Sequence, residues 1–476
     1  MLYINGEWKP SITGNTIEVF NPATGKLIDK VAAGGREETI EAIESAKAAF
    51  KKWKKAPAQE RGMYLAQISA KMREKADEIA ETITLEMGKP LPDAKREVLG
   101  AINYVDWYGE EAKRVYGETI PASQPDKQLM VLRQPIGVTA AITPWNFPAS
   151  MITRKIAPAI AAGCTVVLKP APSTSISAIK VFECFHEAGL PKGVANLILG
   201  PAEEIGPELT QHPDVRKLTF TGSTAVGKKL LRDSADTVKK VSMELGGHAP
   251  LIVFEDADID AAVKGVLLTK FKNSGQTCIS TNRVYVAESI ANAFSQKLAQ
   301  KVSGLKVGDG IENGIDIGPL INERALEKVE SHVEDALQHN GEILCGGKRY
   351  VDNVPNGHFY EPTVINYAND DMKIAREETF GPVAPIFTFK DEEEIVKRAN
   401  HDRYGLAAYC FTKDLGRGHR MMQELEYGIV GINDPAPIVT QAPFGGMKES
   451  GMGREGGKSG IMEYLEEKFV SIHTGK

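Results

Sequence analysis

Continuous apolar segments alternate with helical patterns between residues 137 and 254 of this 476-residue chain. Segments 137–142, 165–169 and 250–254 are apolar nearly throughout, which predicts strands buried on both faces. Strands of this kind, separated by helices, predict a parallel sheet covered on both sides. Ligands of such sheets bind at the carboxyl ends of the strands. The turns after these strands are therefore the first candidates for a functional site.

The rest of the chain predicts a second α/β region and a β-arm. Strands are expected near 284–287, 342–344, 360–365, 383–389, 406–411 and 429–433. The first 35 residues contain short strands, and helices are expected from Arg36, from Pro57 to Gly88 and over 92–116. Two strand-like segments, 129–135 and 468–473, lie outside this alternation. A chain of this length predicts two or three domains.

The composition is typical of a soluble globular protein and argues against several other classes. Charged residues make up 25% and hydrophobic residues 42%, and the formal net charge is −6, which gives no basic footprint for nucleic acid. Five cysteines without a CxxC pair argue for a reducing compartment and against a disulfide framework or a zinc site. The N-terminus lacks an apolar signal core, and the apolar segment 156–168 is too short for a bilayer. We expect a cytoplasmic protein without a metal site or a membrane partner.

The turn after 137–142 reads Thr143-Pro-Trp-Asn-Phe-Pro148. Its two prolines make the loop rigid and present Asn146. A side-chain amide held in this way can donate a hydrogen bond to a developing oxyanion. The alternative is an ordinary turn asparagine.

Three further strands end in chemically active turns. Lys169, before a proline, suits ribose or phosphate oxygens, although a snorkelling lysine has the same pattern. Residues 221–227, Thr-Gly-Ser-Thr-Ala-Val-Gly, form a glycine turn that opens a helix and so predict a phosphate cradle. This turn is neither GxGxxG nor a Walker motif. Glu244, followed by Leu and two glycines, is a candidate general base or else a capping or ion-paired carboxylate.

Cys278 ends the turn-forming run 273–278, between a helical pattern and a strand pattern. It is a candidate nucleophile facing a cleft, or a buried structural thiol. Glu378 and Phe380 offer a carboxylate for ribose and an aromatic surface, or a helix-end acid and a core residue. The glycine-rich stretch 443–457 can approach a ligand closely or form a flexible loop.

Together these segments resemble the NAD(P)-dependent aldehyde dehydrogenase superfamily. The resemblance rests on Thr143-Pro-Trp-Asn-Phe-Pro, Lys169-Pro, Phe220-Thr-Gly-Ser-Thr-Ala-Val-Gly, Glu244-Leu-Gly-Gly, Gly275-Gln-Thr-Cys, Glu377-Glu-Thr-Phe-Gly-Pro and Pro443-Phe-Gly-Gly, in this order. It covers nearly the whole chain.

The resemblance implies a three-part α/β architecture. It predicts a Rossmann-like parallel-sheet domain for NAD(P) over 1–118 and 137–247 and an α/β catalytic domain over 248–461. A small β oligomerisation arm is expected over 119–136 and 462–476. Relatives of this type are dimers or tetramers in which the arm crosses to a partner, so we expect a homo-oligomer.

The resemblance also implies the chemistry. Cys278 attacks the aldehyde, Asn146 and the backbone N–H of Cys278 hold the oxyanion, and hydride leaves to the nicotinamide. Glu244 then activates the water that hydrolyses the thioester. Lys169 and Glu378 are implied ribose contacts, Ser223 a phosphate contact and Phe380 a packing surface. The motifs also place the following residues in the cofactor site: Thr143, Pro144, Trp145, Pro172, Gly222, Gly227 and Leu245.

Within the superfamily, Thr153-Arg-Lys155, residues 451–456 and residues 463–466 resemble succinate-semialdehyde dehydrogenases. Arg154 would bind the distal carboxylate of a semialdehyde, or pair with a structural acid. Lys272 stands where that group usually has a second arginine, and keeps the charge without the bidentate fork. Another short aldehyde, such as lactaldehyde, glycolaldehyde or glutarate semialdehyde, is the alternative.

Three further features bear on cofactor and class. Pro172 stands where NAD-selective relatives often have a glutamate, so NADP or dual use is expected. Ser280 stands where many relatives have a second cysteine, which excludes a disulfide within this loop. The presence of both Cys278 and Glu244 argues against a non-catalytic structural protein, and Glu244 argues against an acylating dehydrogenase.

Overall fold

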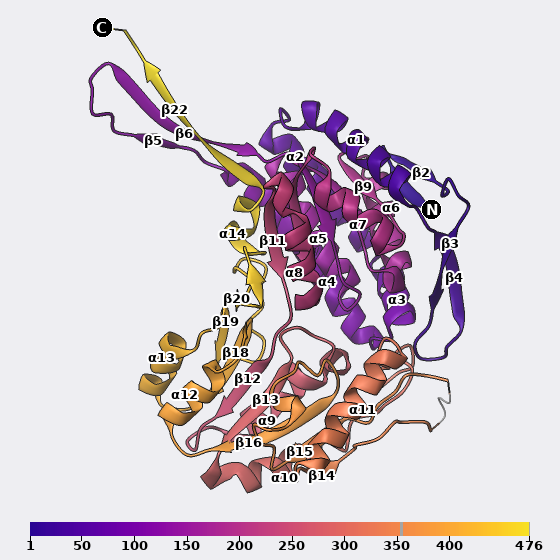
Figure 1. Cartoon of the computed structure of the whole chain (residues 1–476), viewed down its shortest axis with the longest axis vertical. Helices are drawn as coiled ribbons and strands as arrows, with labels where there is room; N and C mark the ends of the chain where they lie inside the picture. Colours follow the sequence, from indigo (N-terminus) through magenta and orange to yellow (C-terminus); the bar gives the residue numbers. More distant parts are fainter. Residues whose placement is uncertain (353–355, 476) are drawn as a thin grey trace.

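The computed structural model describes residues 1–352 and 356–475. It has two α/β bodies and a β-arm that projects from the first body (Figure 1). This confirms the fold class expected from the alternating strands and helices. Two large hydrophobic cores fill the second body and one fills the first.

The first sheet has eight strands within the described residues, in the order β2-β1-β9-β8-β7-β10-β11-β21. The five strands from β9 to β11 run parallel, and the three other pairings, β2 with β1, β1 with β9 and β11 with β21, are antiparallel. The strands are β1 (Leu2–Ile4), β2 (Glu7–Lys9), β7 (Val138–Ile142), β8 (Thr165–Lys169), β9 (Ala195–Leu197), β10 (Val215–Thr221), β11 (Lys240–Glu244) and β21 (Gly451–Met452).

The register of these strands brings the predicted turns to one edge. Ile142 of β7 is paired with Lys169 of β8 on one side and with Phe220 of β10 on the other. Thr221 at the end of β10 is paired with Glu244 at the end of β11. The side chains that follow the four strands therefore lie at the same carboxyl edge, as the sequence predicted.

Helices cover this sheet (Figure 1). They are α1 (Arg36–Trp53), α2 (Ala58–Glu74), α3 (Ala76–Met87), α4 (Leu91–Glu111), α5 (Pro148–Ala162), α6 (Ser175–Glu187), α7 (Ala202–Gln211) and α8 (Thr224–Asp233). The single helix expected from Pro57 to Gly88 is wrong. The chain leaves helical geometry at Lys75 (φ −103°, ψ 13°), so α2 and α3 are separate helices. The apolar spacing continues across this break, so the periodicity of the apolar residues could not reveal where α2 ends.

The second sheet has the order β14-β15-β16-β13-β12-β18-β19, with only β14 antiparallel to its neighbour in the described chain. Its strands are β12 (Ala249–Val253), β13 (Thr281–Ala287), β14 (Glu342–Cys345), β15 (Thr363–Asn366), β16 (Val383–Phe389), β18 (Ala407–Phe411) and β19 (Ile429–Ile432). Its helices are α9 (Ile259–Val266), α10 (Ala291–Val302), α11 (Glu323–Gln338), α12 (Glu392–Asn400) and α13 (Leu415–Glu424). Two smaller pairings join β3 (Thr16–Phe20) to β4 (Leu27–Ala32) and β17 (Tyr404–Gly405) to β20 (Met447–Lys448).

The arm consists of β5 (Glu118–Ile120), β6 (Lys127–Pro135) and β22 (Leu465–His473). β22 pairs antiparallel with β6 over its whole length, from Leu465 opposite Pro135 to His473 opposite Lys127. The arm leaves the first body next to α14 (Gly457–Met462), and the C-terminus lies near its tip (Figure 1). The last part of the range 248–461 therefore returns to the first body, because β21 joins its sheet and α14 packs on α4 and α5.

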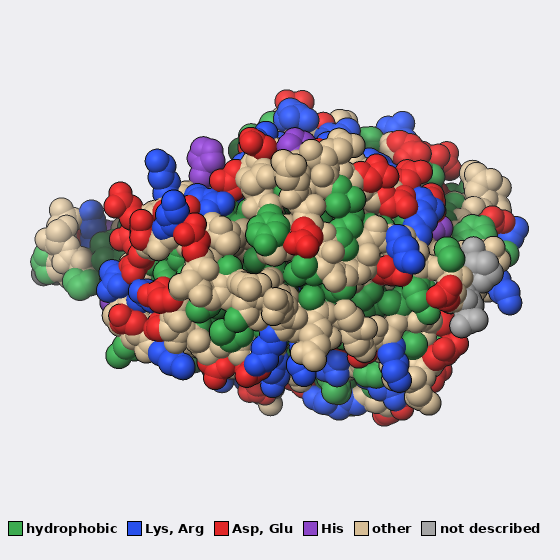
Figure 2. Space-filling view, turned by 90° about the horizontal axis from the view of Figure 1, so that it is seen from below, with side chains coloured by type: hydrophobic (Ala, Val, Ile, Leu, Met, Phe, Trp, Pro, Cys, Tyr) green, Lys and Arg blue, Asp and Glu red, His purple; other side chains and the backbone are tan. Residues whose placement is uncertain are grey.

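The surface carries mixed charge. On the face seen from below, acidic and basic side chains are interspersed over the described residues instead of forming one basic patch (Figure 2). Among the helices of the described chain, none combines the length and the apolar character that a membrane crossing requires.

Candidate active site

The loop that carries Cys278 is strongly constrained. It follows α9 and a π-helical turn, Leu267–Phe271, and precedes β13. Asn273, Ser274 and Gly275 have consecutive positive φ angles of 51°, 55° and 75°. A Cβ on Gly275 would lie 2.2 Å from the carbonyl oxygen of Gly381, so only glycine fits. Such backbone strain persists only where surrounding contacts fix it, and it is typical of functional loops.

Contacts from a distant segment, 318–321, hold this loop in place. The Ser274 hydroxyl donates to the carbonyl oxygen of Gly318 at 2.8 Å. The Gln276 side chain accepts a hydrogen bond from the backbone N–H of Ile321 at 2.9 Å and donates to the carbonyl oxygen of Pro319 at 3.3 Å. The nucleophile candidate two residues later is thus presented by a fixed backbone.

The predicted oxyanion donor contacts the same loop. The buried Asn146 amide donates from Nδ2 to the carbonyl oxygen of Gln276 at 2.9 Å. The backbone carbonyl oxygen of Asn146 accepts hydrogen bonds from Nζ of Lys89 at 2.9 Å and from Nδ2 of Asn273 at 3.2 Å. Because a primary amide has two N–H donors, one remains for a ligand after the bond to Gln276.

Two pockets meet at Cys278. One, of about 570 Å³, extends between α4, α5 and the loop 438–444, and the other, of about 550 Å³, lies along the carboxyl edge of the first sheet and the start of α11. Cys278 and Met151 belong to the walls of both. The Cys278 side chain is half-buried, so the structure contradicts the interpretation of a fully buried structural thiol. Burial raises the pKa of Cys278 to about 12, although Arg154 opposes this shift.

Glu244 ends β11 at the same junction. Its side chain is buried, and neither carboxylate oxygen has a hydrogen-bond partner among the described atoms. Burial, and next the charge of Glu455, raise the pKa of Glu244 well above its usual value. A Cβ on Gly445 would lie 2.8 Å from Oε1 of Glu244, so the glycine-rich stretch approaches this carboxyl closely, as expected.

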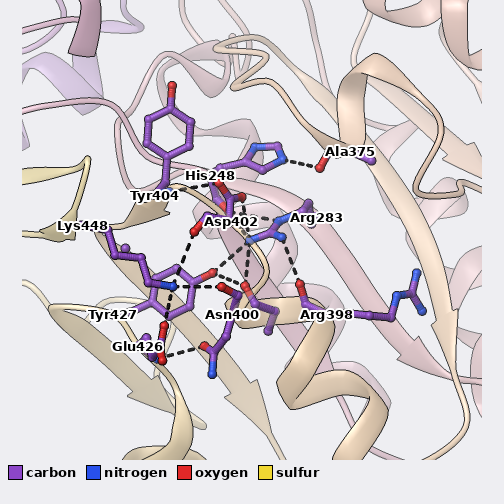
Figure 3. Close-up of polar contacts among 12 residues, drawn as sticks. His248, Arg283, Ala375, Arg398, Asn400, Asp402, Tyr404, Glu426, Tyr427 and Lys448 are labelled. Carbon is purple, nitrogen blue, oxygen red and sulfur yellow. Dashed lines mark hydrogen bonds and ion pairs between the residues drawn. The ribbon is translucent and has the colours of Figure 1, made fainter.

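A buried polar network anchors the segment after Glu244 (Figure 3). Arg283 of β13 donates to the carbonyl oxygen of His248 from Nε at 3.2 Å and from Nη2 at 2.9 Å. The same guanidinium donates to the Tyr427 hydroxyl at 2.9 Å and forms an ion pair with Asp402 at 3.2 Å. Residues 244–248 are thereby tied to the strand that follows the nucleophile loop.

The second pocket has the features that a dinucleotide requires. Ser223 caps α8 by accepting a hydrogen bond from the N–H of Val226, which places a helix N-terminus in the wall, a favourable position for phosphate. Phe380, at a strained φ of 58°, lies edge-on to Trp145 with ring centroids 5.7 Å apart. Oε1 of Glu378 accepts a hydrogen bond from Gly247 at 3.1 Å, and burial raises the pKa of Glu378 to about 7. The aromatic, carboxylate and phosphate-binding groups fit NAD(P).

A profile of the aldehyde dehydrogenase family matches residues 8–470. The chain belongs to this family. It is 50% identical to the glutarate-semialdehyde dehydrogenase of Pseudomonas putida, over 99% of this chain and 97% of that protein. It is also 50% identical to the NADP(+) succinate-semialdehyde dehydrogenase of Escherichia coli, over 98% of this chain and 97% of that protein. The crystal structure of an NADP-dependent enzyme of E. coli superposes with a TM-score of 0.98 at 50% identity, covering 99% of this chain and 98% of that chain.

The protein is thus an NAD(P)-dependent aldehyde dehydrogenase, and its pockets can be compared with the predicted cofactor residues. Those that line the second pocket are Pro144, Trp145, Gly222, Ser223, Leu245, Glu378 and Phe380. Thr143, Lys169, Pro172 and Gly227 lie outside its wall. Gly227 instead gives space to a neighbour, because its Cβ would lie 2.3 Å from Leu245. Lys169 is buried at the same sheet edge and donates to the carbonyl oxygen of Pro170 at 3.3 Å.

Several pocket residues of this aldehyde dehydrogenase were missed by the sequence analysis. Arg324 and Lys328 of α11 line the cofactor pocket, and Lys89 and Glu97 line the other one. None of them follows a predicted strand. Only Lys89 had a local signal, in Gly88-Lys-Pro90, and that signal was interpreted as a helix stop.

The first pocket contains the predicted substrate residues. Arg154 lies in its wall, but Nη2 is 3.1 Å from Oε2 of Glu455 and the guanidinium lies 4.0 Å from the centroid of the Phe444 ring. Glu455 thus already pairs with this guanidinium, and its other carboxylate oxygen pairs with Lys155. Lys272 is exposed in the same wall and forms no ion pair with any residue that the structure describes.

Proposed function

We propose that Cys278 is the nucleophile that oxidises a short aldehyde bearing a distal carboxylate, with succinate semialdehyde as the first candidate. The observation that carries this proposal is the position of Cys278 in the walls of both pockets. A thiol at this junction can bond to an aldehyde carbon that enters through the first pocket. The same carbon then faces the second pocket, where a hydride acceptor fits.

In the first step the thiol proton of Cys278 passes to solvent water, and the sulfur forms a bond to the aldehyde carbon while the π electrons of the carbonyl move to its oxygen. Negative charge develops on the aldehyde oxygen, where the second N–H of the Asn146 amide is available as a donor. One such donor contributes roughly 10²–10³ in rate in a comparable enzyme. The bonds from Lys89 and Asn273 to the carbonyl oxygen of Asn146 fix this residue before the substrate arrives.

When bound, the nicotinamide of NAD(P) accepts the hydride, which leaves an acyl group on the Cys278 sulfur. Pro144, Trp145 and Phe380 would pack against this end of the cofactor, Glu378 would bind ribose, and Ser223 with the α8 N-terminus would bind the diphosphate.

Glu244 would complete the cycle as general base. It takes a proton from a water that adds to the thioester, and the carboxylic acid and the free thiol result. Burial raises the pKa of Glu244 well above its usual value, and a carboxylate with a raised pKa is a stronger base. Gly445 leaves space beside this carboxyl because it has no side chain.

Charge in the first pocket supports a semialdehyde with a carboxylate. Three of its cations already have acidic partners, since Lys89 pairs with Glu97, Arg96 with Asp93, and Arg154 with Glu455, an acid that it shares with Lys155. Lys272 adds a positive charge that has no acidic partner among the described residues. Both curated relatives described above act, by their names, on semialdehydes whose other end is a carboxylate. Glutarate semialdehyde, one methylene longer, is therefore the main alternative.

We further propose that NADP is accepted, alone or with NAD. Pro172 lies exposed in the short helical turn Pro172–Thr174 and brings no negative charge near Lys169. The name of the E. coli relative specifies NADP. A cytoplasmic location, expected from the sparse cysteines, remains a prediction.

The arm supports a homo-oligomer, with a homotetramer or dimer as the proposed state. Its strands project from the body (Figure 1), and Phe469 and Ile472 of β22 are exposed at 61% and 41%. Exposed apolar side chains on a projecting sheet suit contact with a second copy. Sedimentation analysis of the full chain and of a Phe469→Ser variant tests this, and an unchanged monomer in both would refute it.

Initial-rate measurements test the proposed activity. The substrates are succinate semialdehyde, glutarate semialdehyde, lactaldehyde, glycolaldehyde and acetaldehyde, each with NAD and with NADP, and with or without coenzyme A. We expect the highest kcat/KM for succinate semialdehyde and no requirement for coenzyme A. A preference for acetaldehyde would refute the carboxylate-binding pocket.

A further inference from the structure

Lys89 is almost completely enclosed by Asn146, Phe147 and Glu97 of α4. It is 2% exposed and follows Gly88, where the chain is wedged against a neighbouring segment. A Cβ on Gly88 would lie 2.2 Å from Cγ of Pro319, and the backbone N–H of Leu91 donates to Gly310 at 2.8 Å. The backbone on both sides of Lys89 is therefore fixed.

The ammonium of Lys89 makes three contacts. It forms an ion pair with Glu97, donates to the carbonyl oxygen of Asn146 at 2.9 Å, and lies 3.7 Å from the centroid of the Phe147 ring. The bond to Asn146 is charge-assisted and shorter than the 3.2 Å bond from Asn273 to the same oxygen.

Glu97 connects this lysine to the start of α5. Its Oε1 accepts hydrogen bonds from the backbone N–H groups of Ala149 at 3.0 Å and Ser150 at 3.3 Å. A carboxylate at this position binds the unsatisfied N–H groups of a helix start and compensates the helix dipole. The pair thus holds both ends of the short segment 146–150.

Stability alone does not account for this pair. Replacing a buried ion pair by apolar side chains of similar volume is often neutral or stabilising, because two charges must be desolvated. Here the pair lines the substrate pocket and contacts the residue whose amide faces the nucleophile loop. A group that fixes a donor before charge develops contributes to catalysis without touching the substrate.

We propose that Lys89 and Glu97 act as positioning residues that hold Asn146 in the orientation required for oxyanion stabilisation. Lys89 fixes the backbone carbonyl of Asn146, Glu97 fixes Lys89 and the α5 start, and the side-chain amide of Asn146 keeps one donor for the substrate oxygen. This inference rests on the proposed role of Cys278. An active Cys278→Ala variant would reject that role, whereas the Lys89 variants test only the positioning.

The test uses Lys89→Met, the pair Lys89→Met/Glu97→Gln and Asn146→Ala. The readout is the pre-steady-state burst of NAD(P)H with succinate semialdehyde. We expect Lys89→Met to slow the burst by about tenfold or more, a part of the 10²–10³ attributed to one oxyanion donor. In the Asn146→Ala background the same change should slow it by less than about twofold, because coupled residues are not additive.

Two measurements separate positioning from general damage. In Lys89→Met, cofactor affinity is measured by fluorescence titration, and the reactivity of Cys278 is measured as its rate of alkylation by iodoacetamide. Both should stay within about twofold of the unaltered protein, well below a tenfold change, which corresponds to about 1.4 kcal/mol. The double variant Lys89→Met/Glu97→Gln leaves no uncompensated buried charge. It replaces Lys89→Met in the test if that single variant does not fold.

Lys239→Met is the matched control. Lys239 is also a buried lysine that donates to backbone carbonyls, those of Val215 at 3.0 Å and His212 at 3.2 Å, and it lines neither pocket described above. Its burst should match that of the unaltered protein. The proposal is overturned if Lys89→Met slows the burst equally in the Asn146→Ala background, or if it leaves the burst unchanged in a folded protein.

Discussion

A Cβ atom on Gly247 would lie 2.3 Å from the carbonyl oxygen of Cys278. The segment that carries Glu244 and the loop that carries Cys278 therefore touch directly through their backbones.

We predict that Gly247→Ala separates the two and lowers kcat by about tenfold or more, since a misplacement of 1 Å can cost about 10² in rate. Steady-state kinetics measure this effect. Gly314→Ala is a control, because a Cβ there meets nothing within 4 Å, although its φ of +78° adds strain. Equal activity of Gly247→Ala and the unaltered protein would contradict the prediction.

Removal of the thiol gives the most direct prediction. Cys278→Ala should abolish aldehyde oxidation and leave cofactor binding measurable by titration, because Cys278 occupies only one end of the cofactor pocket. Cys345→Ala, which removes a half-buried cysteine of β14, should retain full activity. Full turnover by Cys278→Ala would end the assignment of the nucleophile.

Because Lys272 has no acidic partner among the described residues of the first pocket, we predict that its substitution weakens binding of an anionic substrate. Lys272→Met should raise KM for succinate semialdehyde by roughly 5- to 30-fold with little change in kcat, the pattern of a lost ground-state contact of about 1–2 kcal/mol. Lys272→Arg should lower KM, because the guanidinium binds a carboxylate in two places. The same variants should leave acetaldehyde kinetics unchanged. A comparable loss with acetaldehyde would show that Lys272 acts through the loop backbone.

The proposed use of NADP predicts that a negative charge at position 172 weakens NADP binding. Pro172→Glu should raise KM for NADP by about tenfold or more and spare NAD, since a carboxylate repels a 2′-phosphate. Burial lowers the pKa of Lys169 to about 8, so its positive charge is present below that pH and lost above it. Affinity for NADP should therefore fall between pH 7 and pH 9, while affinity for NAD changes less. Titrations at both pH values decide this, and a pH-independent NADP affinity would remove Lys169 from the phosphate site.

The rate at which Cys278 reacts in the protein without cofactor should depend on pH. Burial raises the pKa of Cys278 to about 12, so the protonated form dominates at neutral pH in the protein without cofactor. Because only the thiolate reacts, alkylation by iodoacetamide should accelerate about tenfold for each pH unit from 7 to 9. Mass spectrometry of the modified Cys278 peptide measures the rate. A plateau below pH 9 would mean that Arg154 outweighs the effect of burial.

The parallel sheets were predictable because each strand carries its own apolar pattern. β8 and β16 have the bounds that the sequence indicated, and Lys169, Glu244 and Asn146 lie at one sheet edge because each ends or follows a strand. The break at Lys75 was not predictable, since the apolar spacing continues across it. The pairings of Arg154 with Glu455 and of Lys89 with Asn146 join segments 301 and 57 residues apart, and tertiary packing alone creates them.

The same limit applies to the substrate. Arg154 was expected either to bind a carboxylate or to pair with a structural acid, and the sequence could not show that Glu455 pairs with both Arg154 and Lys155. Lys272, which looked like the weaker substitute, is the cation of this pocket that has no acidic partner among the described residues. Local patterns therefore identified the reaction, whereas the distribution of charge around it required the fold.

The shared wall at Cys278 also defines a strategy for chemical probes. A ligand that enters from the substrate side reaches the sulfur before it reaches Trp145 and Phe380 on the other side. An electrophile flanked by an anionic tail and a flat aromatic group would therefore fill both compartments while bonding to one thiol. Such a molecule would distinguish this enzyme from other cysteine proteins by two independent recognition steps.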